Sequence, residues 1–223
     1  SPEEVADLLI NPCPDNPSLS VVRIPSFPQS KSPYLLDFNV FNECPDARSL
    51  VLDALMEEIR MLPNLREISM VTGILGEKSR FFTQKIAEQL DIFGTVAHVT
   101  PRNSIHHLER IYRPKRTNRD SSKSLILSGV MYNWEILNRA VEVTKRDRLD
   151  RREGEGFVPI FVATLVDNES PWFDEALNKA GLVNHRSLVG TSTLIARRAL
   201  LERFGEEAVA GIRERNLRFL GLL

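Results

Sequence analysis

The sequence lacks several features that define common protein classes. Its 29 lysines and arginines nearly balance 30 aspartates and glutamates, for a net charge of −1, so the whole chain has no electrostatic preference for nucleic acid or an anionic membrane. No apolar run approaches membrane-spanning length, and the N-terminus lacks a signal-peptide pattern. We expect an intracellular, most simply cytoplasmic protein without nucleic-acid or membrane partners. Because the chain starts at Ser1 rather than Met, we expect it to be trimmed, and targeting information can be missing.

Cysteine is also scarce. The two cysteines, Cys13 and Cys44, stand far apart and next to prolines, which favours reduced thiols over a disulfide framework. Neither has a Cys-x-x-Cys partner or a nearby histidine, so we expect no zinc site and no other metal site.

Signatures of several enzyme classes are absent. No serine lies in a Gly-x-Ser-x-Gly elbow, and the spacing of Gly73, Gly76 and Lys78 is too short for a Walker A loop. His106 and His107 are adjacent, so they would diverge on a helix and face opposite ways on a strand. Either could act as an acid or base only with an orienting carboxylate, which the sequence does not place. No catalytic residue is assigned.

The length of 223 residues suits one large domain. Within it we expect a proline-rich N-terminal extension with edge strands (1–33), an α/β core (34–190), and a C-terminal helix with an apolar tail (191–223). The expected helices are 2–9, 47–61, 80–90, 133–147, 172–180 and 194–215; the expected strands are 20–24, 34–41, 68–71, 95–99, 125–127, 157–166 and 187–190. This alternation predicts a mostly parallel central sheet with helices on both faces. The long irregular segment 100–123 is expected to be functional or mobile.

One stretch dominates the interpretation. Leu125–Leu127 reads as a buried strand that Ser128 and Gly129 interrupt, and Asn133 can cap the helix that follows. The first N–H groups of a helix lack partners within it, so a phosphate or carboxylate is the natural occupant of such a position.

These segments resemble the type I phosphoribosyltransferases, and most of all the orotate phosphoribosyltransferases. The resemblance spans about Phe27 to Val189. Residues 32–38 resemble the family's early strand, 71–76 its pyrophosphate-contacting turn, and 99–116 its mobile cationic loop. Residues 125–136 resemble its phosphoribosyl-pyrophosphate (PRPP) motif, and 157–167 the strand that follows this motif. It implies a phosphoribosyltransferase-like, Rossmann-related fold and a homodimer. The exposed apolar tail, Leu217–Leu223, would also need cover from the domain or a partner.

The departures from the family pattern concern the PRPP motif. In the family two adjacent acidic residues hold the ribose hydroxyls, and small residues wrap the 5′-phosphate; here Ser128 and Gly129 stand at the acidic positions. We therefore expect a remodelled ligand-binding loop, with an ordinary strand–turn–helix filled by core aromatics as the alternative. Its residues are Ser128, Gly129, Val130, Tyr132, Asn133, Trp134 and Glu135. An accessible Trp134 would favour the pocket, and a buried one the core.

Two further segments are candidate anion sites. Thr72, Gly73, Gly76 and Lys78 form either an anion-binding turn or a plain tight turn. A basic loop could receive a phosphorylated small molecule or an acidic protein surface, or be simply solvated; it comprises Arg102, His106, His107, Arg110, Arg113, Lys115 and Arg116. Asp37 and Asp167, at ends of expected strands, are either surviving site carboxylates or turn and cap residues.

The leading hypothesis is a phosphoribosyltransferase-like protein that has lost the PRPP-binding acidic pair and serves as a non-catalytic binding, regulatory or assembly component, without a cofactor. The alternative is a divergent enzyme using the same cleft, of the orotate phosphoribosyltransferase type or acting on another phosphorylated or nucleotide substrate. Only that reading calls for Mg²⁺. A third possibility is an unrelated α/β nucleotide-binding module whose order of elements mimics the family.

Overall fold

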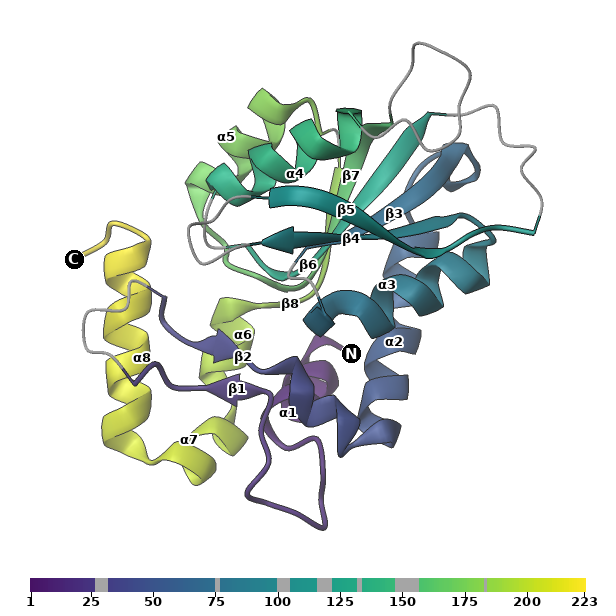
Figure 1. The fold of residues 1–223 in the computed structure, drawn as a ribbon. Helices are drawn as coiled ribbons and strands as arrows, with labels where there is room; N and C mark the ends of the chain where they lie inside the picture. The colour runs from purple at the N-terminus through teal and green to yellow at the C-terminus, as the bar shows by residue number, and fades with distance from the viewer. Residues whose placement is uncertain are drawn as a thin grey trace. The chain divides into compact units, whose positions relative to one another are not determined.

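The computed structural model describes residues 1–26, 32–74, 77–99, 105–115, 122–131, 134–146, 157–182 and 184–223, and Figure 1 draws their helices and strands. The described side chains exclude those of 77, 78, 99, 105–107 and 134. The chain divides into two compact units: unit 1 comprises 1–55, 166–171 and 188–223, and unit 2 comprises 56–165 and 172–187. Whether they fold as one domain, as the length predicts, stays a prediction.

A six-stranded sheet forms the centre of the fold, in the order β5-β4-β3-β6-β7-β8. Its strands are β3 (Ile68–Ile74), β4 (Phe93–Val99), β5 (Ile105–Tyr112), β6 (Lys123–Val130), β7 (Val158–Asp167) and β8 (Asn184–Gly190). β3 pairs in parallel with both β4 and β6, and β5 pairs antiparallel with β4. The mostly parallel sheet predicted from the sequence is therefore confirmed.

Helices cover both faces of this sheet in unit 2 (Figure 1). Successive side chains of a strand point to opposite faces of the sheet, so neighbouring residues of β3 contact different helices. Ile74 packs in a buried cluster with Ile126 of β6 and with residues of α4 (Trp134–Arg146) and α5 (Pro171–Ala180). Its neighbour Gly73 instead faces Ser79 and Thr83 of α3 (Glu77–Leu90) on the other side.

Unit 1 holds the two ends of the chain. α1 (Pro2–Ile10) begins at Ser1 with a capping box: the Ser1 side chain accepts from the N–H of Glu4, and the Glu4 side chain accepts from the Ser1 amino group. Asp7 of α1 forms a two-pronged ion pair with Arg197, at 2.8 and 2.5 Å. The remaining elements of the N-terminal half are β1 (Val22–Arg23), β2 (Leu35–Leu36), the 3₁₀ helix η1 (Phe38–Asn42), α2 (Pro45–Arg60) and the 3₁₀ helix η2 (Leu65–Glu67).

Two expectations for unit 1 are wrong. The strand expected over 34–41 is limited to β2, which pairs with β1 in a separate two-stranded sheet, because the Asp37 side chain accepts from the N–H of Asn39 and starts η1. The single C-terminal helix expected over 194–215 is three helices, α6 (Thr191–Ala196), α7 (Arg198–Phe204) and α8 (Glu206–Phe219). Arg197 is extended between the first two, and Gly205, at φ +81°, separates the last two.

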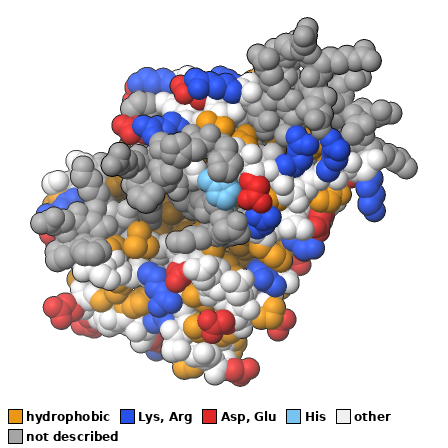
Figure 2. All heavy atoms as spheres, in the orientation of Figure 1, with side chains coloured by type: hydrophobic (Ala, Val, Ile, Leu, Met, Phe, Trp, Pro, Cys, Tyr) orange, Lys and Arg blue, Asp and Glu red, His pale blue; other side chains and the backbone are white. Residues whose placement is uncertain are grey.

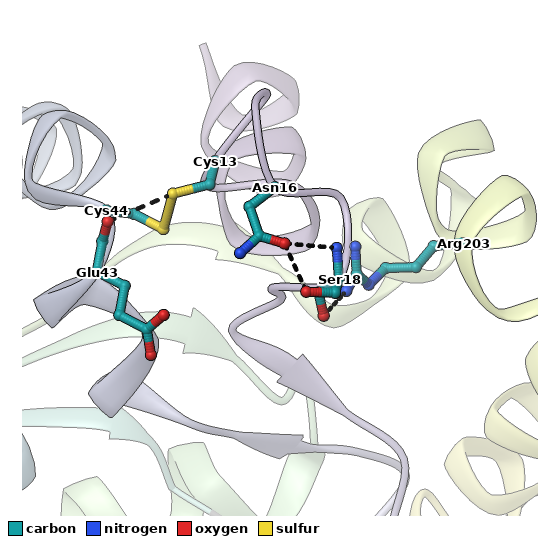
Figure 3. The surroundings of a disulfide bond; sticks show 6 residues. All are labelled: Cys13, Asn16, Ser18, Glu43, Cys44 and Arg203. Atoms are coloured by element: carbon teal, nitrogen blue, oxygen red, sulfur yellow. Dashed lines mark hydrogen bonds between the residues drawn. A yellow bond between two sulfur atoms is a disulfide. The ribbon is translucent and has the colours of Figure 1, made fainter.

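The expectation of reduced thiols is also wrong, because Cys13 and Cys44 form a disulfide (Figure 3). Their Cα atoms lie 5.6 Å apart, within the usual range for such a bond. The loop that follows α1 places Cys13 beside the residue that precedes α2, and sequence separation carries no information about this proximity.

The described residues contain no helix that is both long enough and apolar enough to cross a membrane. Acidic and basic side chains are interspersed on the face shown in Figure 2, among the residues that it colours.

Candidate functional site

The order of the strands marks one edge of the sheet at which a ligand crevice is expected. From β3 the chain adds β4 on one side, and later it adds β6 on the other side of β3. In open α/β sheets, ligands bind outside the carboxyl ends of the strands where the order reverses in this way. β3 and β6 are paired there, with Gly73 opposite Leu127. The two segments selected from the sequence, 72–78 and 128–135, thus include the carboxyl ends of two neighbouring strands, Ile74 of β3 and Val130 of β6.

Thr72 and Gly73 lie within β3, not in the turn that the sequence predicted. Thr72 is fully buried, and its hydroxyl lies 2.9 Å from that of Thr95 on β4. A Cβ at Gly73 would lie 2.1 Å from Oγ1 of Thr83 and 2.7 Å from Oγ of Ser79. These two residues therefore serve the packing of β3 on its neighbours. Gly76 and the side chain of Lys78 lie outside the described residues.

The second segment begins at the end of β6, and this strand is also longer than predicted. Ser128 and Gly129 do not interrupt it, since β6 continues to Val130. Ser128 is only 2% exposed, and its hydroxyl donates to the carbonyl of Val130 at 3.4 Å. No carboxylate stands among the last three residues of the strand.

The helix α4 starts just after this strand, with Glu135 exposed in its first turn. A carboxylate is favoured there by the partial positive charge of the helix N-terminus, by about 0.3–1 kcal/mol. Tyr132, Asn133 and the side chain of Trp134 lie outside the described residues, so the choice between an open pocket and a filled core stays a prediction.

The segment 100–123, expected to be irregular, contains the edge strand β5, which pairs with β4. This pairing separates the predicted basic residues. β5 starts opposite Val99, at the carboxyl end of β4, and ends opposite Gly94. Arg113 and Lys115 follow that far end, roughly 20 Å away along the strand, where the Lys115 N–H donates to Asp91 at 2.9 Å.

Arg110 lies between these ends, with its guanidinium 5.8 Å from the centre of the Phe93 ring. Arg102, Arg116 and the side chains of His106 and His107 lie outside the described residues. The structure therefore does not gather the described basic residues into one cluster at the crevice.

A polar cluster that sequence reasoning missed joins β5 to its neighbours. Glu109 of β5 accepts from Arg80 of α3 at 2.8 Å, and its second oxygen lies 2.9 Å from Nε2 of His98 on β4. The hydrogen bonds with His98 and then Arg80 lower the pKa of Glu109. The side chains are about one third exposed, at 36% for Arg80 and Glu109 and 32% for His98. No sequence signal identified the cluster, because its members come from three separate elements and β5 was not predicted.

The two candidate carboxylates of unit 1 act locally in the structure. Asp37 caps η1 and pairs with Arg23 at 3.5 Å. Asp167 accepts from the N–H of Glu169 at 2.8 Å, in the loop that follows β7. Glu169 itself has a left-handed backbone, at φ +55°, and its carboxylate accepts from the N–H and the hydroxyl of Ser192 at 2.6 and 2.7 Å. The turn-and-cap interpretation therefore accounts for these contacts.

The described residues offer few donors for Mg²⁺. Among the described residues, no three histidine, cysteine, aspartate or glutamate side chains converge as metal ligands do. At the end of β6 the side chains offer one buried hydroxyl, whereas Mg²⁺ is usually held by one or two carboxylates and substrate phosphates. The described residues of this strand end do not fit a metal-bound PRPP.

Comparison with solved structures assigns the fold to the type I phosphoribosyltransferase class. UMP synthase of Leishmania donovani is 17% identical with a TM-score of 0.68; the match covers 100% of this chain and 43% of the synthase, so the chain spans less than half of that protein. Orotate phosphoribosyltransferase from Aeropyrum pernix is 18% identical with a TM-score of 0.59, covering 91% and 99% of the two chains. Adenine phosphoribosyltransferase from Leishmania donovani is 13% identical with a TM-score of 0.52, covering 85% and 80%.

These identities establish the fold alone. The resemblance seen in the sequence is confirmed at that level, which argues against an unrelated module with a similar order of elements. No protein-family model matches the sequence, and no curated protein matches it.

Proposed function

We propose that this protein is a non-catalytic member of the phosphoribosyltransferase fold class, which binds an anionic partner in the crevice between β3 and β6. The proposal rests on one observation: β6 ends in Ser128, Gly129 and Val130, where the resembling family has adjacent acidic residues. A ribose with its hydroxyls and a metal-bound diphosphate need carboxylates at that point. Ser128 offers only a hydroxyl, which is buried and bonded to its own strand.

Retained helix N-termini support binding of an anion in this crevice. α3, of 14 residues, and α4, of 13 residues, both begin just after the two paired strands. The partial positive charge at the N-termini of both helices favours a phosphate or carboxylate at this edge. The partner we propose is a phosphorylated small molecule or an acidic segment of a protein. The carboxylate of Glu135 would repel a highly charged anion, and so limits the negative charge of the group that can bind at the N-terminus of α4.

The test compares ligands by their effect on thermal stability. At 100 times its dissociation constant a ligand adds about 2.7 kcal/mol to the stability of the folded state. We expect no stabilisation by PRPP with Mg²⁺ and no release of pyrophosphate with orotate or adenine. The orotate phosphoribosyltransferase from Aeropyrum pernix serves as the positive control in the same plate. Magnesium-dependent stabilisation by PRPP would contradict the proposal.

A divergent enzyme is the second candidate, and the same two helix N-termini favour it, because they retain the place for a phosphorylated substrate. This alternative predicts turnover rather than binding alone. Incubation of the full chain with phosphorylated sugars and nucleobases, with and without Mg²⁺, followed by mass spectrometry of the products, separates the two candidates. Any product absent from a heat-denatured control favours the enzyme.

Self-association is also part of the proposal. Leu217, Leu222 and Leu223, in and after α8, are 39%, 67% and 73% exposed, and burial of such side chains in a homodimer would be favourable. Light scattering at micromolar concentration should give the mass of a dimer. A monomer at these concentrations would count against this part of the proposal.

A further inference from the structure

The disulfide of unit 1 borders a surface pocket, and its two cysteines differ in exposure. Cys44 is 2% exposed, whereas Cys13 is only partly buried. The pocket, of about 360 Å³, is lined by residues 12–16 from the loop after α1 and by residues 43–47 around the start of α2. A small molecule can therefore approach the bond from the side of Cys13.

We infer that Cys13–Cys44 is a thiol–disulfide exchange site for small aminothiols. The incoming thiolate attacks Sγ of Cys13, the bond between the two cysteine sulfurs breaks, and Cys44 leaves as a thiolate that takes a proton from water. A second thiolate then attacks the small thiol's sulfur in the mixed disulfide, the bond between that sulfur and Cys13 breaks, and Cys13 leaves as a thiolate that takes a proton from water. The net step reduces the protein disulfide to two thiols and oxidises two small thiols to their disulfide.

The start of α2 favours Cys44 as the leaving group. The carbonyl of Cys44 accepts from the N–H of Arg48 at 3.1 Å, the first bond of this 16-residue helix, and Pro45 follows at its first position. Cys44 is therefore the N-cap, where partial positive charge stabilises a thiolate. A stabilised thiolate leaves faster in exchange reactions.

The reduced state has a partner ready for Cys13. Its Sγ lies 3.6 Å from the carbonyl oxygen of Glu43 (Figure 3); the disulfide has no proton to donate, but the Cys13 thiol formed on reduction would have one. The bond can thus open without leaving this sulfur unpartnered.

The loop itself is also held by contacts that do not involve the disulfide. Arg203 of α7 donates to the carbonyls of Pro17 and Ser18 at 2.6 and 2.7 Å, and Oδ1 of Asn16 accepts from the N–H of Ser18 at 3.2 Å. Because these contacts remain after reduction, Cys13 stays near Cys44, and the bond can form again.

The charge of the pocket selects among thiols. Asp15, Glu43 and Asp46 are among its lining residues, and no lysine, arginine or histidine is. Carboxylates raise the local concentration of a cationic reagent and repel an anionic one. An aminothiol such as cysteamine, which carries a positive charge, should therefore react faster than a thiol that carries a sulfonate.

The first experiment traps the intermediate on the full chain. The oxidised protein is treated with cysteamine, quenched with iodoacetamide without denaturant, and mapped by mass spectrometry without reduction. We expect a linked Cys13–Cys44 peptide before treatment, and afterwards the cysteamine adduct on Cys13 with the alkyl group on Cys44. Absence of the linked peptide, or the adduct on Cys44, would overturn the inference.

The second experiment measures the charge preference as a ratio of rates. At low salt, cysteamine should reduce the bond at least about three times faster than 2-mercaptoethanesulfonate, and the ratio should fall towards 1 at high salt. Asp15→Asn should lower the ratio, while Asp174→Asn, an exposed acid on α5 that does not line the pocket, should not. Equal rates for the two thiols in the unmodified protein would overturn the inference even if a variant fails to fold.

Discussion

Replacement of Gly73 by alanine tests whether this residue serves packing or ligand binding. The added Cβ would lie 2.1 Å from Oγ1 of Thr83 and 2.7 Å from Oγ of Ser79, closer than van der Waals contact allows. Thr83 is fully buried, and its hydroxyl donates to the carbonyl of Ser79 at 2.9 Å. The side chain cannot rotate away without losing this bond, so β3 and α3 must move apart.

The expected cost combines two terms. Overpacking of a core by one methyl group costs about 1–3 kcal/mol, and loss of the Thr83 hydrogen bond adds about 1 kcal/mol. The lower chain entropy of alanine in the unfolded state offsets about 0.4–1 kcal/mol. We expect Gly73→Ala to lower the free energy of unfolding by about 1–3.5 kcal/mol, measured by urea denaturation followed by circular dichroism.

Two further variants make the measurement specific. Thr83→Ala removes the atom nearest to the new methyl group, so Gly73→Ala should cost less in that background, with a coupling energy of about 1 kcal/mol or more. Gly211→Ala is the matched control, because a Cβ there meets only Arg215, at 3.6 Å, within α8. It should stabilise the protein by about 0.5–1 kcal/mol.

The packing argument is refuted if Gly73→Ala leaves stability unchanged and shows no coupling with Thr83→Ala. Loss of anion binding by a variant of unchanged stability would instead favour the anion-turn interpretation of this glycine.

Three other perturbations test the contacts described above. Cys44→Ser opens a loop of 31 residues, so it should cost about 3–4 kcal/mol by the chain-entropy estimate; a reductant should then have no further effect on the urea midpoint. Glu109→Gln should destabilise at pH 7 and by progressively less as the pH falls below the unfolded-state pKa of the carboxyl group, because the hydrogen bond with His98 lowers the pKa of Glu109, so its stabilisation is present above the unfolded-state pKa and lost as the pH falls through the folded-state pKa. Arg197→Lys should lower the melting temperature in differential scanning fluorimetry, since lysine cannot form both bonds with Asp7; an equal melting temperature would show that the second bond contributes nothing.

The parts of the fold that the sequence predicted well depend on local signals. Pro2–Ile10 carries its own cap and apolar face, and the continuous apolar run of β7, rich in β-branched residues, favours a buried strand. Apart from β5, the order of strands and helices from β3 to β8 followed from the change between these two patterns. The resulting topology was enough to bring the two candidate segments to one edge of the sheet.

The failures concern contacts between distant parts of the chain. β5 lacks regular alternation, and its polar Glu109 is accommodated because Arg80 and His98 lie beside it. The pairing of Cys13 with Cys44 depends on where the loop after α1 runs. Thr72 and Gly73 look like turn residues by type, yet their neighbours on β4 and α3 place them inside a strand. No local pattern contains this information.

The pairing of β3 with β6 also sets the order in which unit 2 can assemble. β4 and β5 are joined by a short connection and can zip together early, whereas Ile68 must find Lys123 across all of α3, β4 and β5. Long-range parallel pairing of this kind is slow, because the entropy of closing the intervening chain is lost before contacts compensate for it. The edge at which we propose that a ligand binds is complete only once β3 and β6 have paired. A molecule bound there would slow the separation of β3 from β6, and it could not speed the hairpin that forms before it.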